Sequence, residues 1–305
     1  MSRGAAVESA EGEVRTESGR VEALDGVELF WREWGPPGSA PGGRQQAVIL
    51  FVHGAGEHSG RYEDFGRYFA SRGVPVVAYD HRGLGRSGGP RGHVDRFSDY
   101  ISDLMLLRDF ASGRYPGAGV ILVGHSMGGL ISLAAAEAYP EAFAAVVVSG
   151  PCLGLAVKVP GWKAFLGRVM ARVFPRLTMA NEIDPGVLAR NPEVGRRYMS
   201  DPHVCRVVSA GWFVELLRAM EETNGGADRI RAPVFILQGT ADRLVDPSAS
   251  RAFFERLADV PKEFRFLEGF YHELFQEDER HEVFSLIEDW LVTRGLIKPK
   301  VEAAM

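Results

Sequence analysis

The chain has 305 residues, of which 46% are hydrophobic and 25% charged, and its formal net charge is −5. The apolar fraction and the balanced charge exclude a chain that is disordered throughout, and the slight acidic excess argues against a nucleic-acid-binding surface. The N-terminus has no apolar segment typical of a signal peptide, so we expect a cytoplasmic protein.

The N-terminal part of the chain predicts a tail followed by a hairpin. Residues 1–12 are small, polar and acidic, which is typical of a mobile tail. Two alternating stretches within 13–34 flank Asp25-Gly26, a pair that favours a two-residue hairpin turn. The Pro- and Gly-rich segment 35–46 is then predicted to be a loop.

From residue 47 onward, apolar runs alternate with helical patterns. Most of the runs are continuous, as is typical of strands covered on both faces. The predicted strands are 47–52, 74–79, 120–124, 144–149, 234–237 and 263–267, and the predicted helices lie near 61–72, 97–112, 127–139, 248–258 and 280–294. This alternation predicts an α/β fold with an open, mostly parallel sheet and helices on both faces.

Residues 151–231 interrupt this alternation, because they contain no convincing strand. Apolar residues recur there with the helical period of about 3.6, and a second helical pattern covers 204–221. The apolar face of the first pattern comprises Trp162, Phe165, Leu166, Val169, Met170 and Val173. We therefore predict a helical cap at 151–231, over a core formed by 13–150 and 232–305.

The sequence Gly124-His125-Ser126-Met127-Gly128 is a G-x-S-x-G pattern between a predicted strand and a predicted helix. The pattern is known as the nucleophile elbow, a sharp turn that holds the serine in a strained conformation and leaves no room for side chains at the glycines. The turn raises the serine hydroxyl above the carboxyl ends of the strands, where open α/β sheets bind ligands. We therefore predict that Ser126 is a catalytic nucleophile.

A serine hydroxyl needs a base, and the expected chain order in this arrangement is serine, acid, histidine. His272 lies in the loop after the last predicted strand, whereas the ring of His125 should point away from the Ser126 hydroxyl. Asp242 follows the preceding predicted strand and is expected to hold the imidazole in the correct tautomer. Asp246 is the rival acid, but its position before a helical pattern favours a capping role.

The negative oxygen that forms during attack on a carbonyl needs preorganised hydrogen-bond donors. The backbone N–H of Met127 directly follows the nucleophile. The backbone N–H of Ala55 lies in a glycine-rich loop after the first predicted parallel strand. We predict that these two groups form the oxyanion hole.

Two other motifs lack the context that their usual functions require. Residues 83–88 match G-x-G-x-x-G, but Gly89-Pro90 follows, which cannot open a helix for a dinucleotide. His272-Glu273 does not continue as H-E-x-x-H, because position 276 is Gln. We therefore expect no metal and no organic cofactor, and we expect Cys152 and Cys205 to be reduced and buried.

Several segments together point to a known family. They are HGAGEHSGRY at 53–62, YDHRGLGRS at 79–87, VGHSMGG at 123–129, LQGTADRLVD at 237–246 and YHELFQE at 271–277, with weaker similarity at 191–205. With these motifs the chain resembles the monoacylglycerol lipase and lysophospholipase group of serine α/β-hydrolases. The resemblance implies an α/β-hydrolase fold, a helical cap that shapes an apolar acyl tunnel, and the triad and oxyanion donors predicted above.

The resemblance also suggests how the alcohol end of a substrate is held. In such lipases polar groups that correspond to Glu57, Arg61 and Tyr198 hold the glycerol. The mammalian-type pattern has a histidine three residues after the catalytic one, where this chain has Phe275, so strict monoglyceride selectivity is in question. An alternative, which fits the sequence equally well, is that Glu57 and Arg61 pair with each other and only stabilise the loop.

We therefore expect a serine hydrolase that cleaves lipid esters, first of all monoacylglycerol to fatty acid and glycerol, through an acyl-enzyme on Ser126. The alternatives are a lysophospholipase, a general carboxylesterase or, from another class, a catalytically silent ligand-binding protein. The cap is expected to bind the acyl chain and to contact a membrane surface peripherally, although the basic residues at 158–176 also fit simple solvation. No nucleic-acid partner is expected, and the sequence leaves the oligomeric state open.

Overall fold

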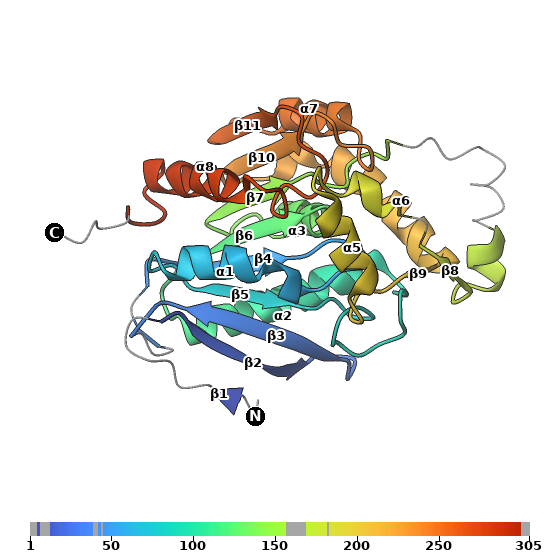
Figure 1. Cartoon of the computed structure of the whole chain (residues 1–305), viewed down its shortest axis with the longest axis horizontal. Coiled ribbons are helices and arrows are strands. Elements are labelled where there is room, and N and C mark those ends of the chain that lie inside the picture. Colours follow the sequence, from blue (N-terminus) through green and yellow to red (C-terminus); the bar gives the residue numbers. More distant parts are fainter. Residues whose placement is uncertain are drawn as a thin grey trace.

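A mostly parallel sheet runs through the centre of the molecule (Figure 1). The computed structural model describes residues 5–6, 13–38, 42–43, 45–156, 169–181 and 183–299. The sheet has nine strands in the order β1-β2-β3-β5-β4-β6-β7-β10-β11. Their bounds are β1 Ala5–Ala6, β2 Arg15–Glu22, β3 Glu28–Gly35, β4 Ala47–Val52, β5 Val76–Tyr79, β6 Gly119–His125, β7 Ala145–Ser149, β10 Val234–Gly239 and β11 Lys262–Leu267.

The six strands from β5 to β11 in that order pair in parallel, whereas β1, β2 and β3 pair antiparallel at one edge. Every residue of β4, β5, β7 and β10 is buried, which explains why these strands are continuous apolar runs without alternation. The predicted α/β architecture is confirmed.

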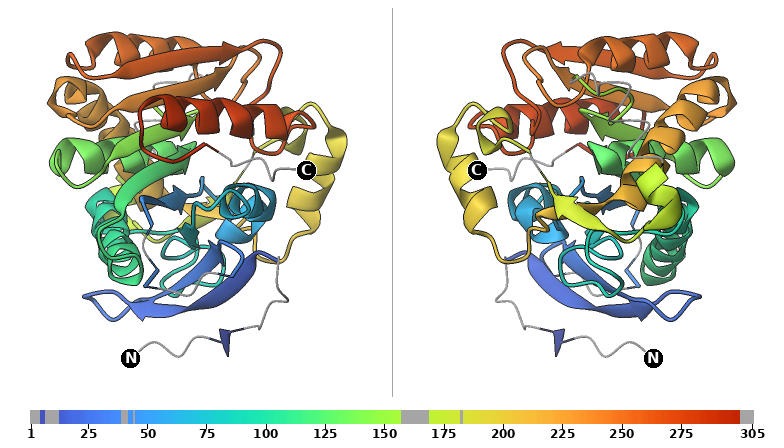
Figure 2. Two further views of the ribbon diagram at one scale, coloured as in Figure 1. Left: turned by 90° about the vertical axis from the view of Figure 1, so that its left-hand side faces the viewer. Right: turned by 90° about the vertical axis from the view of Figure 1, so that its right-hand side faces the viewer.

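Helices cover both faces of this sheet (Figure 2). The helices α1 and α8 pack on one face, and α2, α3 and α7 pack on the other, so that each face has its own apolar core. Their bounds are α1 Glu63–Ala70, α2 Phe97–Arg114, α3 Met127–Ala138, α7 Pro247–Arg256 and α8 Arg280–Thr293, and the 3₁₀ turns are η1 Ser59–Tyr62, η2 Pro185–Val187 and η3 Ala227–Arg229. None of the helices in the described ranges is long and apolar enough to cross a bilayer.

The hairpin at the N-terminal edge differs in its turn from the prediction. The register pairs Glu22 with Glu28, so the connection is the loop 23–27 and the predicted two-residue turn is wrong. Gly26 has φ 83°, but Asp25 does not take a positive φ, and a two-residue type I′ turn needs both. Of the predicted tail 1–12, only Ala5–Ala6 is described, and it pairs with β2.

The insertion between β7 and β10 contributes the helices α5 Pro192–Ser200 and α6 Ala210–Gly225. It also contains a small antiparallel pair, β8 Thr178–Ala180 with β9 Val207–Ser209, so the expectation of no strand in 151–231 is wrong. Strands of three residues are too short to show an alternating pattern. The helix predicted at 204–221 begins only at 210, because the Ser209 side chain caps it by accepting the Trp212 backbone N–H at 3.0 Å.

Candidate active site

Ser126 lies in the turn between β6 and α3, with φ 55° and ψ −119°. It is the only non-glycine residue with positive φ in the described part of the chain. A Cβ on Gly124 would come within 2.5 Å of the Gly128 carbonyl oxygen, and a Cβ on Gly128 would collide with the carbonyl oxygen of Val52. Both glycines are therefore required by the close approach of backbone that holds the serine in this strained turn.

The three predicted catalytic side chains lie together at the carboxyl end of the sheet. His272 Nε2 is 2.9 Å from Ser126 Oγ, and His272 Nδ1 is 2.8 Å from Asp242 Oδ2. Ser126 follows β6, Asp242 follows β10 and His272 follows β11, so loops after three parallel strands bring the groups together. The histidine and aspartate side chains are only 5% and 0% exposed, which keeps water away from their hydrogen bond.

Asp242 accepts further hydrogen bonds that fix its carboxylate. The backbone N–H groups of Leu244 and Val245 donate to Oδ1 at 2.9 and 3.1 Å, and Gln238 Nε2 donates to Oδ2 at 3.0 Å. Asp246 instead accepts the Ser248 backbone N–H at 2.8 Å and caps α7. The structure therefore separates the two rival acids into one that faces His272 and one that caps a helix.

His272 and Asp242 stabilise each other's charged form. Burial disfavours the protonated imidazole of His272, but the charge of Asp242 and its hydrogen bond outweigh burial and raise the pKa of His272. Burial likewise opposes ionisation of Asp242, but His272 and the backbone N–H donors lower the pKa of this carboxyl. The arrangement thus stabilises an imidazolium, which is the state a general base reaches after it takes a proton.

His125 is next to the serine in sequence but has a different environment. Its Nδ1 lies 3.1 Å from the Ser149 carbonyl oxygen, and its ring packs 4.8 Å from that of His272. Burial, together with the charge of His272, lowers the pKa of His125 to about 3. A histidine with so low a pKa is a poor general base at neutral pH.

The two predicted oxyanion donors belong to the turn after β6 and to the loop after β4. Met127 is the first residue of α3, so its N–H has no acceptor within the helix. Ala55 lines the cavity beside Ser126. Its loop is held in place by His53, which is bonded through Nδ1 to the Gly54 carbonyl oxygen at 2.8 Å and through Nε2 to the His81 backbone N–H at 3.0 Å.

A cavity of about 850 Å³ extends from Ser126 between the core and the cap. Its apolar lining comes mostly from the cap and includes Leu155, Met170, Met179, Trp212, Phe213 and Leu216. Of the predicted acyl-binding residues, Met170 lines the cavity and Val169 is 41% exposed, while Trp162 and Phe165 lie outside the described residues. The free thiol of Cys152 also lines the cavity, and burial raises its pKa to about 12.

One wall of the cavity carries a buried ion cluster, which we call the polar wall: Glu57, Arg61 and Glu273. Arg61 Nη1 donates to Glu57 at 2.6 Å and to Glu273 at 2.8 Å, and its Nη2 donates to the second oxygen of Glu273 at 2.7 Å. Burial opposes ionisation of Glu57, but chiefly the charge of Arg61 lowers its pKa to about 2. Glu57 and Glu273 line the cavity, whereas Arg61 lies behind them.

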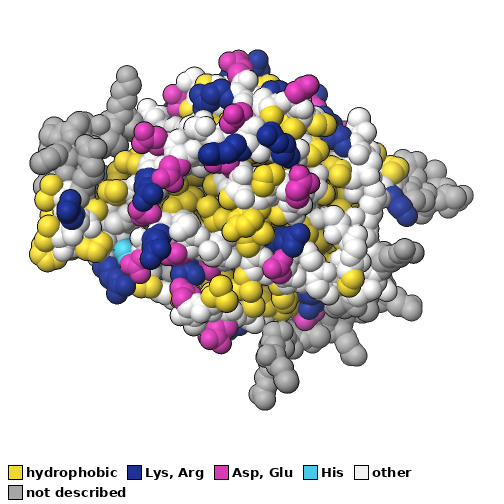
Figure 3. Space-filling model, turned by 180° about the vertical axis from the view of Figure 1, so that it is seen from behind, with side chains coloured by type: hydrophobic (Ala, Val, Ile, Leu, Met, Phe, Trp, Pro, Cys, Tyr) yellow, Lys and Arg dark blue, Asp and Glu magenta, His cyan; other side chains and the backbone are white. Residues whose placement is uncertain are grey.

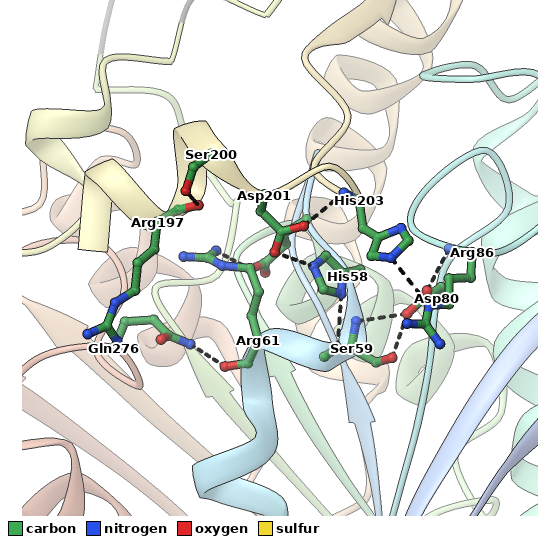
Figure 4. A network of polar contacts seen from close by, with 12 residues as sticks. His58, Ser59, Arg61, Asp80, Arg86, Arg197, Ser200, Asp201, His203 and Gln276 are labelled. Carbon is green, nitrogen blue, oxygen red and sulfur yellow. Dashed lines mark hydrogen bonds and ion pairs between the residues drawn. The ribbon is translucent and has the colours of Figure 1, made fainter. Parts of the chain in front are cut away.

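The polar wall is attached to the cap by further contacts (Figure 4). His58, which precedes Arg61, bonds through Nε2 to Asp201 at the end of α5 at 2.9 Å. The Arg61 guanidinium lies 5.1 Å over the ring of Tyr198 from the same helix. Tyr198 is 4% exposed and lines the cavity, and its hydroxyl has no hydrogen-bond partner among the described residues. The part of the chain that the structure describes therefore leaves this buried hydroxyl unpaired beside the cavity.

Comparison with known proteins agrees with this geometry. Residues 43–279 match the family described as serine aminopeptidase, S33. The chain belongs to this family. As an S33 family member it is a serine hydrolase with the α/β-hydrolase fold, as the sequence motifs predicted.

Lipases are among the proteins and solved structures to which the chain is similar. Human monoglyceride lipase is 35% identical over 274 residues, which are 88% of each chain. A phospholipase of Bacillus subtilis is 32% identical over 79% of this chain and 93% of its own. The crystal structure of Paleococcus ferrophilus monoacylglycerol lipase is 34% identical, with a TM-score of 0.78, over 87% of this chain and 98% of that chain. The resemblance to the monoacylglycerol lipase group is confirmed.

Two features of this S33 family member were not evident from the sequence. Phe275 is 2% exposed and packs against Phe51 and Phe65 with ring centroids 5.8 and 5.4 Å apart, inside the core on the α1 and α8 face. Glu273, which sequence reasoning considered only as part of a metal motif, takes a place in the polar wall. In the sequence, only its position directly after His272 indicates that Glu273 lies at the site.

Proposed function

We propose that the protein hydrolyses monoacylglycerols to fatty acid and glycerol through an acyl-enzyme on Ser126. The observation that carries the proposal is the hydrogen-bonded chain Ser126–His272–Asp242 at one end of a large, mainly apolar cavity. The names of the human and Paleococcus relatives support the same substrate.

The steps follow from the geometry. His272 accepts the Ser126 proton while Oγ attacks the ester carbonyl, and Asp242 stabilises the imidazolium that forms. The N–H groups of Ala55 and Met127 donate to the oxyanion. His272 then protonates the leaving glycerol oxygen, and a water molecule activated by the same base hydrolyses the acyl-enzyme.

The alcohol and acyl ends of the substrate would occupy different parts of the cavity. The Tyr198 hydroxyl and the Glu57 carboxylate would bond glycerol hydroxyls, with Arg61 holding Glu57 in position from behind. The acyl chain would pack against apolar side chains such as Met170 and Trp212, where each buried methylene contributes about 0.8 kcal/mol. Phe165, Trp162 and Val169 remain proposed members of this acyl-binding surface.

The experiment that tests the proposal compares kcat/KM for monoacylglycerols with 8, 12 and 18 acyl carbons and for lysophosphatidylcholines of the same chains. We expect hydrolysis of the monoacylglycerols to exceed that of the matched lysophospholipids, and Ser126→Ala to abolish both. A preference for the lysophospholipids would instead support phospholipase activity, the function named for the Bacillus subtilis relative. Failure of a fluorophosphonate to label Ser126 would support the silent binding protein.

The exposed part of the cap supports peripheral membrane contact by the same enzyme. Phe174 and Leu177 are 59% and 47% exposed, and Arg172 and Arg176 lie beside them in the chain. Figure 3 shows apolar and basic side chains together at the edge of the molecule formed by the cap. Exposed apolar side chains interspersed with arginines suit the interface of an anionic membrane.

A flotation assay tests this contact with vesicles of pure phosphatidylcholine and with vesicles that also contain phosphatidylglycerol. We expect stronger binding to the anionic vesicles, and loss of binding in the double variant Phe174→Ser, Leu177→Ser. Fluorophosphonate labelling of Ser126 monitors the integrity of the active site. Equal binding of the variant and the natural protein would contradict the contact.

A further inference from the structure

Glu273 supplies a carboxylate to the wall of the cavity that contains the reaction centre. It directly follows His272 and lines the same cavity as Ser126. His272 must reach the leaving oxygen to protonate it, so the alcohol has to lie beside this imidazole. The other carboxylate of the polar wall, Glu57, lies near the nucleophile, because the position that a Cβ would take on Gly54 is 2.8 Å from Glu57 Oε1 and 3.1 Å from Ser126 Cβ.

The polar wall presents net negative charge to that alcohol. It combines two carboxylates, Glu57 and Glu273, with one guanidinium, Arg61, whose side chains are 3%, 5% and 9% exposed. In the described part of the chain, Arg61 is the only arginine or lysine that forms an ion pair with either carboxylate. Since both carboxylates line the cavity and the guanidinium lies behind them, an alcohol group would meet the negative charges first.

We infer that Glu273 restricts the enzyme to esters of uncharged alcohols and rejects esters whose alcohol carries a phosphate close to the ester bond. The inference rests on the proposed function and names the substrate class of that site. Glu57 and Arg61 alone would be a neutral pair, so the excess negative charge comes from the second carboxylate, Glu273. A phosphate about 8 Å away, at an effective dielectric constant of about 20, would be disfavoured about 30-fold for each unit of its charge.

A matched pair of substrates tests this inference. Decanoylglycerol and its glycerol phosphate ester, decanoyl lysophosphatidic acid, share the acyl chain and the glycerol and differ only in the charged group. Used as monomers below their aggregation concentrations, they should give a kcat/KM at least about 30-fold higher for the neutral lipid with the natural enzyme.

Glu273→Gln removes the charge and keeps an oxygen that accepts a hydrogen bond from Arg61. The ratio of the two kcat/KM values should fall at least about 30-fold in this variant, mainly because the phosphorylated lipid is hydrolysed faster. Glu273→Asp keeps the charge with altered packing, and its ratio should stay within about threefold of the natural enzyme. Glu268→Gln makes the same change of net charge at an exposed position outside the cavity and should leave the ratio unchanged.

The outcomes separate the two proposals. Similar kcat/KM values for the two lipids with the natural enzyme would overturn the charge selection and leave the monoacylglycerol activity intact; this comparison needs no variant to fold. A ratio that falls in Glu273→Asp as far as in Glu273→Gln would assign the selectivity to packing instead of charge. Hydrolysis of neither lipid would overturn the proposed function and the inference with it.

Discussion

Replacing Asp242 with asparagine perturbs one group of the triad while keeping its shape. The carboxylate receives only donors: His272 Nδ1 at 2.8 Å and Gln238 Nε2 at 3.0 Å on Oδ2, and the backbone N–H groups of Leu244 and Val245 on Oδ1. An asparagine amide has one oxygen and one NH₂ group. Whichever way it is oriented, its NH₂ must face groups that themselves donate.

The expected loss follows from the tautomer of His272. If the oxygen of the new amide accepts the two backbone N–H groups, its NH₂ faces Nδ1 and drives the imidazole proton to Nε2, which then cannot accept the Ser126 proton. By comparison with other triads this lowers kcat about 10⁴-fold. The variant also loses the charge that raises the pKa of His272, so this pKa falls. Because the base works only when neutral, the acid limb of the pH–rate profile should move to lower pH.

The assay measures kcat and kcat/KM with p-nitrophenyl butyrate from pH 5 to 9, with circular dichroism to confirm folding. Asp246→Asn is the matched control, because Asp246 caps α7 and faces Ser248 instead of the triad. It should leave both the unfolding free energy and kcat nearly unaltered, because asparagine caps a helix about as well as aspartate. Retention of more than a tenth of kcat in Asp242→Asn, or an acid limb displaced to higher pH, would refute the reasoning.

Three further predictions test the turn and the buried histidines. Ser126→Ala should lower kcat about 10⁶-fold and abolish fluorophosphonate labelling, with an unchanged unfolding transition; residual turnover of a few per cent would exclude Ser126 as nucleophile. Gly128→Ala should lower the unfolding free energy in urea by about 3 kcal/mol, because its Cβ collides with the Val52 carbonyl oxygen, and a neutral effect would contradict this. His81 and His125 have lowered pKa values when folded and bind protons more readily when unfolded, so each should reduce stability by up to about 1.4 kcal/mol per pH unit below about pH 6.5. Urea unfolding from pH 7.5 to 5.5 measures this slope, which His81→Gln should flatten.

The parallel part of the fold could be predicted because burial on both faces leaves a signature in the sequence. The apolar run predicted at 47–52 is β4 as observed, and the helix predicted at 127–139 is α3 to within one residue. The secondary structure of the cap was harder to predict from the sequence. Its strand 178–180 is fully exposed and its partner is equally short, so neither shows the period-two alternation that identifies longer strands.

The candidate site was predictable where a residue type, a loop and a chain order coincide. Ser126, Asp242 and His272 each follow a parallel strand. Chain order, together with the position of each histidine relative to the predicted strands and helices, selects His272 among the eight histidines. Burial and pairing between distant segments were not predictable in this way. The sequence left open whether Arg61 contacts a ligand or supports the loop, and only the fold brings it against Glu273 from the far end of the chain.

The loop that carries His272 is hydrogen-bonded to both the core and the cap. The Glu273 backbone N–H donates to the Leu188 carbonyl oxygen of the cap at 2.7 Å, and Gln276 Nε2 donates to the Arg61 carbonyl oxygen at 2.8 Å. Moving this side of the cap would displace the general base. The opposite side, around 172–180, is exposed and yet contributes to the cavity lining through Leu177 and Met179. An acyl chain that entered through this exposed side would not require the His272 loop to move.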